Sequence, residues 1–148
     1  MANTHLLKTL VEPYVRRWLS QKYNVEFEGH EKEMRLVTGG VHRFDAVSKD
    51  GSIIAGIKTS ALRSDTTKRP IGVGVIKSTF TELYYLSIVN AKRKLMVLTD
   101  KGFYDLFCKE SKGKVSTGIE IIHCQLSQEI LDKICVVHDT CRKEIGKR

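Results

Sequence analysis

Residues 42–60, HRFDAVSKDGSIIAGIKTS, decide the fold that the rest of the chain is expected to adopt. Asp50-Gly51 lies between two short alternating or apolar runs, and such a pair between two strands is the strongest local signal for a β-hairpin. With these two residues as the loop, Asp45 pairs with Gly56 across the hairpin. The stretch therefore predicts two antiparallel strands with a fixed register.

This register places a carboxylate and an ammonium group on the same side of the hairpin. Paired residues share a face, and so do residues two apart, so Asp45, Gly56 and Lys58 are expected on one side. The opposite side would carry Phe44, Ala46, Ala55 and Ile57. The arrangement predicts either a functional site or an ordinary cross-strand ion pair.

The charge of the chain points to a polyanionic partner. Its 148 residues have the length of a single domain, residues 1–148. Lysine and arginine total 25 against 17 acidic residues, which gives a net charge of +8 and a pI near 9.4. Nucleic acid is the first candidate for such a partner and an anionic membrane surface a distant second. Charge that only aids solubility is the alternative.

Several patterns indicate a soluble cytoplasmic protein. No apolar run approaches the eighteen or so residues needed to cross a bilayer. The N-terminal residues carry charges and a proline and lack the small-residue cleavage site of a signal peptide. The four cysteines form no CxxC pair, which favours reduced thiols. They are Cys108, Cys124, Cys135 and Cys141.

The remaining periodicity predicts an α/β domain with a mixed sheet and helices on its faces. Apolar residues at helical spacing predict helices over 3–22 and 75–89, a short helix from Asp100, and a last helix capped by Ser127. Strands are expected over 24–28, 33–37, 92–99 and 119–122. Residues 59–74 are expected to form a long loop, and loops of that length are usually functional or disordered.

Basic side chains gather in and just after this loop. They are Arg63, Lys68, Arg69 and Lys77. Mixed with serine and threonine donors, they have the composition of a phosphate-binding surface, which supplies affinity and register but no sequence readout. A solvated loop without a ligand is the alternative.

The hairpin also carries part of the chemistry needed to cleave a phosphodiester with a metal ion. Mg²⁺ takes oxygen ligands, usually one or two carboxylates together with several waters. A metal ion lowers the pKa of its bound water, and a nearby lysine stabilises the developing negative charge. Asp45 and Lys58 would supply one carboxylate and the lysine.

The order of these features resembles the PD-(D/E)XK, or restriction-endonuclease-like, nuclease superfamily. Members of that family carry an aspartate on one hairpin strand and a (D/E)-X-K tripeptide on the next, and often a glutamate on the first helix. By position, Asp45 matches the aspartate, Lys58 the lysine and Glu12 the helical glutamate. The resemblance spans roughly residues 8 to 125, and it implies that Asp45 and Glu12 hold Mg²⁺ or Mn²⁺ while Lys58 faces the scissile phosphate.

One position departs from the family pattern, because Gly56 stands where the acidic residue of (D/E)-X-K is expected. In the first account the acid is supplied from the helix after the hairpin, as in some members, which makes Glu82 the candidate ligand. Alternatively, Glu12, Asp45 and a backbone carbonyl such as that of Ile57 hold one metal ion. In the third account catalysis is lost and the fold is kept for binding.

The sequence thus predicts a metal-dependent endonuclease that acts on double-stranded DNA. Cleavage of both strands would favour a homodimer, because a two-fold duplex is matched by a two-fold protein. A nucleic-acid-binding module of the same fold without catalysis is the second hypothesis. A protein-interaction domain is the third.

Overall fold

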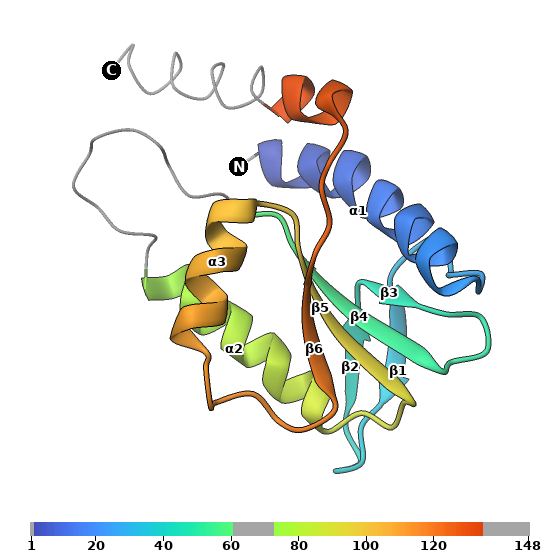
Figure 1. Cartoon of the computed structure of the whole chain (residues 1–148). Coiled ribbons are helices and arrows are strands. Elements are labelled where there is room, and N and C mark those ends of the chain that lie inside the picture. Colours follow the sequence, from blue (N-terminus) through green and yellow to red (C-terminus); the bar gives the residue numbers. More distant parts are fainter. Residues whose placement is uncertain (1, 61–72, 135–148) are drawn as a thin grey trace.

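The computed structural model describes residues 2–60 and 73–134, and Figure 1 shows how their helices and strands are arranged. In chain order these are α1 (Ala2–Tyr23), β1 (Lys32–Arg35), β2 (Val41–Phe44), β3 (Ala46–Val47), β4 (Ile53–Lys58), α2 (Val73–Ser87), β5 (Arg93–Leu98), α3 (Lys101–Glu110) and β6 (Ile119–His123). Residues 128–134 are also helical.

A mixed sheet forms the centre of the fold. Its strands lie in the order β3-β4-β5-β6, with β3 antiparallel to β4 and the last three strands parallel to one another. β1 and β2 pair separately as a two-stranded antiparallel sheet. The predicted α/β class with a mixed sheet is confirmed.

Helices cover both faces of this sheet, with α1 on one side and α2 and α3 on the other (Figure 1). The α1 side buries Val11, Val15 and Leu19 against alternate residues of the strands, such as Ala55 and Val97. The α2 and α3 side is a second apolar cluster, which includes Ile54, Leu86, Met96, Phe103 and Phe107. The two clusters hold α1 against one face of the sheet and α2 and α3 against the other, since burial of apolar area is the main stabilising term in folding.

Helix α1 runs through Pro13 without a break in its assignment. A proline inside a helix removes one backbone hydrogen bond, here in the turn that contains Glu12. Val11, Val15 and Leu19 are fully buried and lie four residues apart on the face toward the sheet.

The turn between β3 and β4 has the predicted register. Ala46 pairs with Ala55 and Val47 with Ile54, as expected for a loop centred on Asp50-Gly51. Gly51 has a φ of 74°, a conformation that glycine adopts without strain. The Asp50 carboxylate accepts hydrogen bonds from the hydroxyls of Ser48 and Ser52, which lowers the pKa of Asp50 to about 2.

Two details of the predicted strands are wrong. The first hairpin strand is not continuous, because the chain bends at Asp45 between β2 and β3. The bend interrupts the alternation of side chains, so Phe44 packs with the α2 and α3 cluster while Ala46 lies on the α1 side. The predicted strand over 24–28 does not form either, and Phe27 makes only an isolated bridge to Ser48.

The C-terminal part of the described chain packs beside α1. Ile130, Leu131 and Ile134 are partly buried against the apolar cluster on the α1 side of the sheet. The Ser127 hydroxyl accepts a hydrogen bond from the Ile130 N–H, as the predicted helix cap. None of the helices within residues 2–60 and 73–134 has the length and apolar character of a membrane span. Cys108 and Cys124 are free thiols, whereas Cys135 and Cys141 lie outside the described residues.

Candidate metal centre

Asp45 occupies the bend between β2 and β3, where backbone and side-chain contacts fix it. Its Oδ2 accepts a hydrogen bond of 2.8 Å from the Ile57 N–H on β4. Its carbonyl oxygen accepts one of 2.9 Å from Nε of Arg16, a buried residue of α1. Burial raises the pKa of the Asp45 carboxyl above its ordinary value, although the Ile57 hydrogen bond opposes this effect. The bend therefore presents a partly desolvated carboxyl group.

Glu12 brings a second carboxyl group to the same place from α1. Only 7% of the residue is exposed, and its Oε2 lies 3.7 Å from the Arg16 guanidinium. Burial and the neighbouring Asp45 raise the pKa of Glu12 to about 7, and the two carboxyls lie close enough to share a hydrogen bond. Two carboxyls in this situation cannot both ionise without cost, so a shared proton or a bound cation would stabilise the pair.

Glu31 contributes a third carboxylate, which the sequence did not single out. One oxygen from each of Glu12, Glu31 and Asp45 lies within 4.8 Å of the others. The Lys8 ammonium of α1 forms an ion pair with Glu31. Three oxygen donors at this spacing suit a hard divalent cation. No local pattern marks Glu31, because its place depends on how the segment after α1 folds back over that helix.

Glu82 lies where a side chain at position 56 would begin. A Cβ atom built on Gly56 would be 2.7 Å from Cγ and 3.2 Å from Oε1 of Glu82. Burial and the charge of Asp45 raise the pKa of Glu82, while His42 and Lys58 act in the opposite direction. A carboxyl group from α2 thus lies beside Gly56, where the charge of Asp45 acts on it.

Lys58 stands at the carboxyl end of β4, beside the end of β5. Its Nζ is 3.5 Å from the Ser78 hydroxyl of α2, and its charge lowers the pKa of Glu82. Within residues 2–60 and 73–134, the ion pairs do not include one between Lys58 and Asp45. The alternative of an ordinary cross-strand pair therefore does not describe these two residues. The end of a parallel strand is also where ligands bind in open α/β sheets.

Other residues expected at the site stand as follows. Ile57 contributes its N–H to Asp45, and a role for its carbonyl oxygen stays a prediction. Lys77 is exposed on α2, next to Ser78. Arg63, Lys68 and Arg69 lie outside the described residues.

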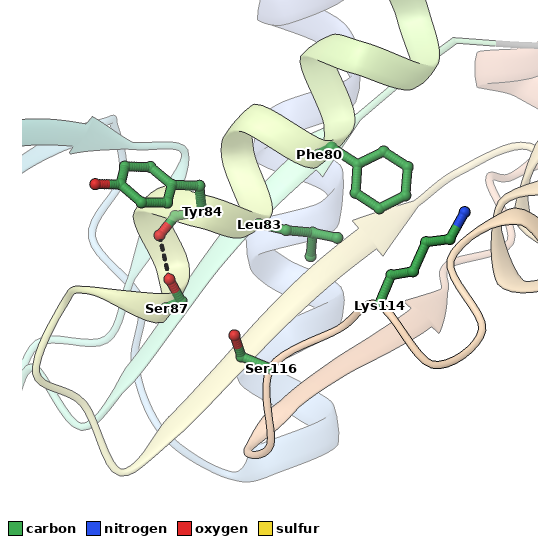
Figure 2. Close-up of a pocket in the computed structure, with 6 residues that line it drawn as sticks. All are labelled: Phe80, Leu83, Tyr84, Ser87, Lys114 and Ser116. Carbon is green, nitrogen blue, oxygen red and sulfur yellow. Dashed lines mark hydrogen bonds between the residues drawn. The ribbon is translucent and has the colours of Figure 1, made fainter.

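A separate open pocket of about 210 Å³ lies between α2 and the segment that joins α3 to β6 (Figure 2). Its lining combines aromatic and apolar side chains with two serines and a lysine: Phe80, Leu83, Tyr84, Ser87, Lys114 and Ser116. None of the carboxyl groups described above lines this pocket. It is therefore not the candidate metal centre.

Three comparisons with known proteins add nothing to this geometry. No family model, curated protein or solved structure matches the chain. The candidate site therefore depends on its own residues and their contacts.

Replacing Glu12 with glutamine is expected to flatten the pH dependence of stability in metal-free protein. The folded protein keeps a proton on Glu12 that the unfolded chain releases between the ordinary pKa of 4.5 and about 7. This contribution to stability is complete below 4.5 and is lost as the pH rises through about 7. The wild-type melting temperature should therefore fall relative to that of Glu12→Gln between about pH 5 and about pH 8.

Thermal melts followed by circular dichroism in a chelating buffer measure this difference. Glu129→Gln is a suitable control, because the Glu129 carboxylate is exposed and pairs with Lys133 on the surface. If the melting temperatures of the wild type and Glu12→Gln change with pH in parallel, the pKa of Glu12 is not raised in the folded protein, and the predicted effect of burial and of Asp45 is wrong.

Proposed function

We propose that this protein is a metal-dependent DNA endonuclease of restriction-endonuclease-like fold. The observation that carries the proposal is the position of Glu82, whose carboxyl group occupies the space at Gly56 and interacts with Asp45. The first of the three accounts of Gly56, an acid supplied from the following helix, is therefore the one we favour. Asp45, Glu12 and Glu82 are the proposed ligands of Mg²⁺ or Mn²⁺.

The donor set fits such an ion. All the candidate donors are oxygens, and carboxylates with a backbone carbonyl, here that of Ile57, are ligands that Mg²⁺ and Mn²⁺ accept. Burial, and after it the charge of Asp45, raise the pKa of Glu12 and Glu82, and a bound cation would offset both effects. When bound, the metal supplies polarisation of the phosphate and a more acidic water.

The protein side chains have distinct proposed roles. Ile57 holds the Asp45 carboxylate and Arg16 holds the Asp45 backbone carbonyl, so the side chain is fixed in one orientation. Lys58 places its ammonium near Glu82 at the end of β4, where it would stabilise charge that develops on the scissile phosphate. Arg63, Lys68, Arg69 and Lys77 are the proposed contacts to the DNA backbone.

A nucleic-acid-binding module without catalysis is the second candidate, and the net charge of +8 favours it as much as it favours the nuclease. Such a module would gain nothing from buried carboxyls next to its phosphate-binding lysine, because these groups repel phosphate unless a cation lies between them. The acidic centre is for this reason the feature that separates the two candidates.

The test is incubation of supercoiled and linear plasmid DNA with the purified protein in Mg²⁺, in Mn²⁺ and in chelator. We expect nicked or linear products with either metal and none in chelator. Binding without cleavage, with a log affinity that falls with log salt, would instead support the binding module. Neither cleavage nor salt-dependent binding would leave a protein-interaction domain. Sedimentation of the protein with and without a DNA duplex tests the expected homodimer.

A further inference from the structure

His42 lies between the β1-β2 sheet and α2, with its side chain 23% exposed. Its Nε2 is 3.2 Å from Oε2 and 3.4 Å from Oε1 of Glu82. An ionised carboxylate can only accept, so with Glu82 ionised, as metal binding requires, Nε2 carries the proton and donates it to Glu82. Within residues 2–60 and 73–134, His42 hydrogen-bonds the Glu82 carboxyl, while Asp45 and Lys58 act on it electrostatically.

Aromatic neighbours fix the plane of the His42 ring. The imidazole stacks on Tyr85 at 3.8 Å between centroids and 7° between planes, and it meets the edge of Phe44 at 4.8 Å. Tyr85 is three residues after Glu82 on α2, so the two side chains lie on the same side of that helix. One helix therefore both stacks the imidazole and receives its hydrogen bond.

The need for such a contact follows from the length of the glutamate. The direction of an acidic side chain on β4 itself would be set by the strand backbone. Glu82 must instead reach Gly56 from a neighbouring helix, through a side chain with three rotatable bonds. An unheld glutamate loses considerable side-chain entropy when it is confined to one rotamer. A hydrogen bond from a ring that packs against Tyr85 and Phe44 reduces the freedom of the carboxylate before any ligand arrives.

We propose that His42 is a positioning residue, which holds the Glu82 carboxylate against Gly56 so that Glu82 and Asp45 bind one divalent cation together. This inference rests on the proposed function, since it assigns His42 a role toward the metal site named there. It predicts that a change at His42 weakens metal binding although the imidazole itself is not a ligand. Hydrogen-bonding partners of metal ligands typically contribute 10- to 100-fold to metal affinity or activity.

The test measures Mn²⁺ binding by isothermal titration calorimetry and the Mn²⁺ concentration for half-maximal DNA cleavage. His42→Phe keeps the stack on Tyr85 and loses the donor, so its Mn²⁺ affinity should fall about 10- to 100-fold. His42→Gln keeps an N–H donor of similar reach and should recover most of that loss. DNA binding measured in chelator should be the same for all three proteins.

Two further outcomes have a clear meaning. If His42→Phe does not fold, as judged by its melting curve, His42→Asn takes its place, because asparagine is too short to reach Glu82. The role of His42 would be overturned, and the proposed function left standing, by either of two results. One is wild-type Mn²⁺ affinity in a folded variant that lacks the donor, and the other is an equal loss of affinity in His42→Phe and His42→Gln. A wild-type protein that binds no Mn²⁺ would overturn the proposed function together with this inference.

Discussion

Replacing Asp45 with asparagine is expected to abolish metal-dependent cleavage while leaving the fold intact. The asparagine side-chain oxygen can still accept the hydrogen bond from the Ile57 N–H, so the bend between β2 and β3 should persist. What is lost is the charge that faces Glu12 and Glu82. Since groups that merely support ligands contribute about 10- to 100-fold, removal of a ligand should lower the cleavage rate by more than about 100-fold.

The same substitution should make the metal-free protein more stable. Asp45 raises the pKa of both Glu12 and Glu82, so a neutral residue at this position removes repulsion from the centre. The melting temperature in chelator at neutral pH should therefore rise in Asp45→Asn. A gain of stability together with a loss of activity is typical of residues kept for function.

Lys58→Met provides the matched comparison at the other end of the site. It removes the ammonium but keeps most of the aliphatic length, so Mn²⁺ should still bind while cleavage falls by about 100-fold or more. Plasmid cleavage rates and Mn²⁺ titrations separate the two variants. Cleavage at the wild-type rate in either variant would mean that the site lies elsewhere in the protein.

The second large effect on cleavage is expected when the acidic side chain is moved from position 82 to position 56. Glu82→Ala should lower cleavage by more than about 100-fold, because it removes a proposed ligand and not merely a group that supports one. Gly56→Asp alone should also lower the cleavage rate, since a Cβ at that position would lie 2.7 Å from Cγ of Glu82. Crowding of this kind typically costs about 1–3 kcal/mol of folding free energy.

The double variant Gly56→Asp/Glu82→Ala should recover activity that neither single variant has. Removal of Glu82 clears the space, and the next contact of the new Cβ would be Cε of Met96 at 3.3 Å, a flexible side chain. The acid would then come from β4, as in the family that the chain resembles. The recovery would appear as a strong non-additivity between two positions in contact.

Gly56→Ala/Glu82→Ala is the packing control for this exchange. It carries the same Cβ at position 56 and the same truncation at position 82, but no acid. Cleavage rates should therefore be higher in the aspartate double variant than in the alanine double variant. Equal rates in the two double variants would show that the space at Gly56 does not serve metal binding.

Local sequence signals were sufficient for the hairpin and for part of the site. An Asp-Gly turn sets its own register, and that register correctly predicts the pairing of Ala46 with Ala55. The apolar spacing of α1 and the run in β5 are likewise local, so an α/β domain with a mixed sheet and helices on its faces could be predicted. Glu82 is a candidate through the family resemblance alone, since in some members the acid missing at Gly56 comes from the following helix.

The remaining features depend on contacts between distant segments. Glu31 joins Glu12 and Asp45 only because the chain after α1 folds back, and no spacing in the sequence encodes that. His42 meets Glu82 across forty positions. The side of the sheet taken by Phe44 was predicted wrongly because regular alternation was assumed through Asp45, where the strand bends.

Anomalous diffraction from crystals soaked in Mn²⁺ tests the central claim most directly. The claim is that Glu82 supplies, from α2, the carboxylate that Gly56 cannot, and that it shares a divalent cation with Asp45. The predicted result is one strong anomalous peak at coordination distance from carboxylate oxygens of both Asp45 and Glu82. A peak held by Glu12 and Glu31 without Glu82, or no peak in the region between α1, β4 and α2, would contradict it.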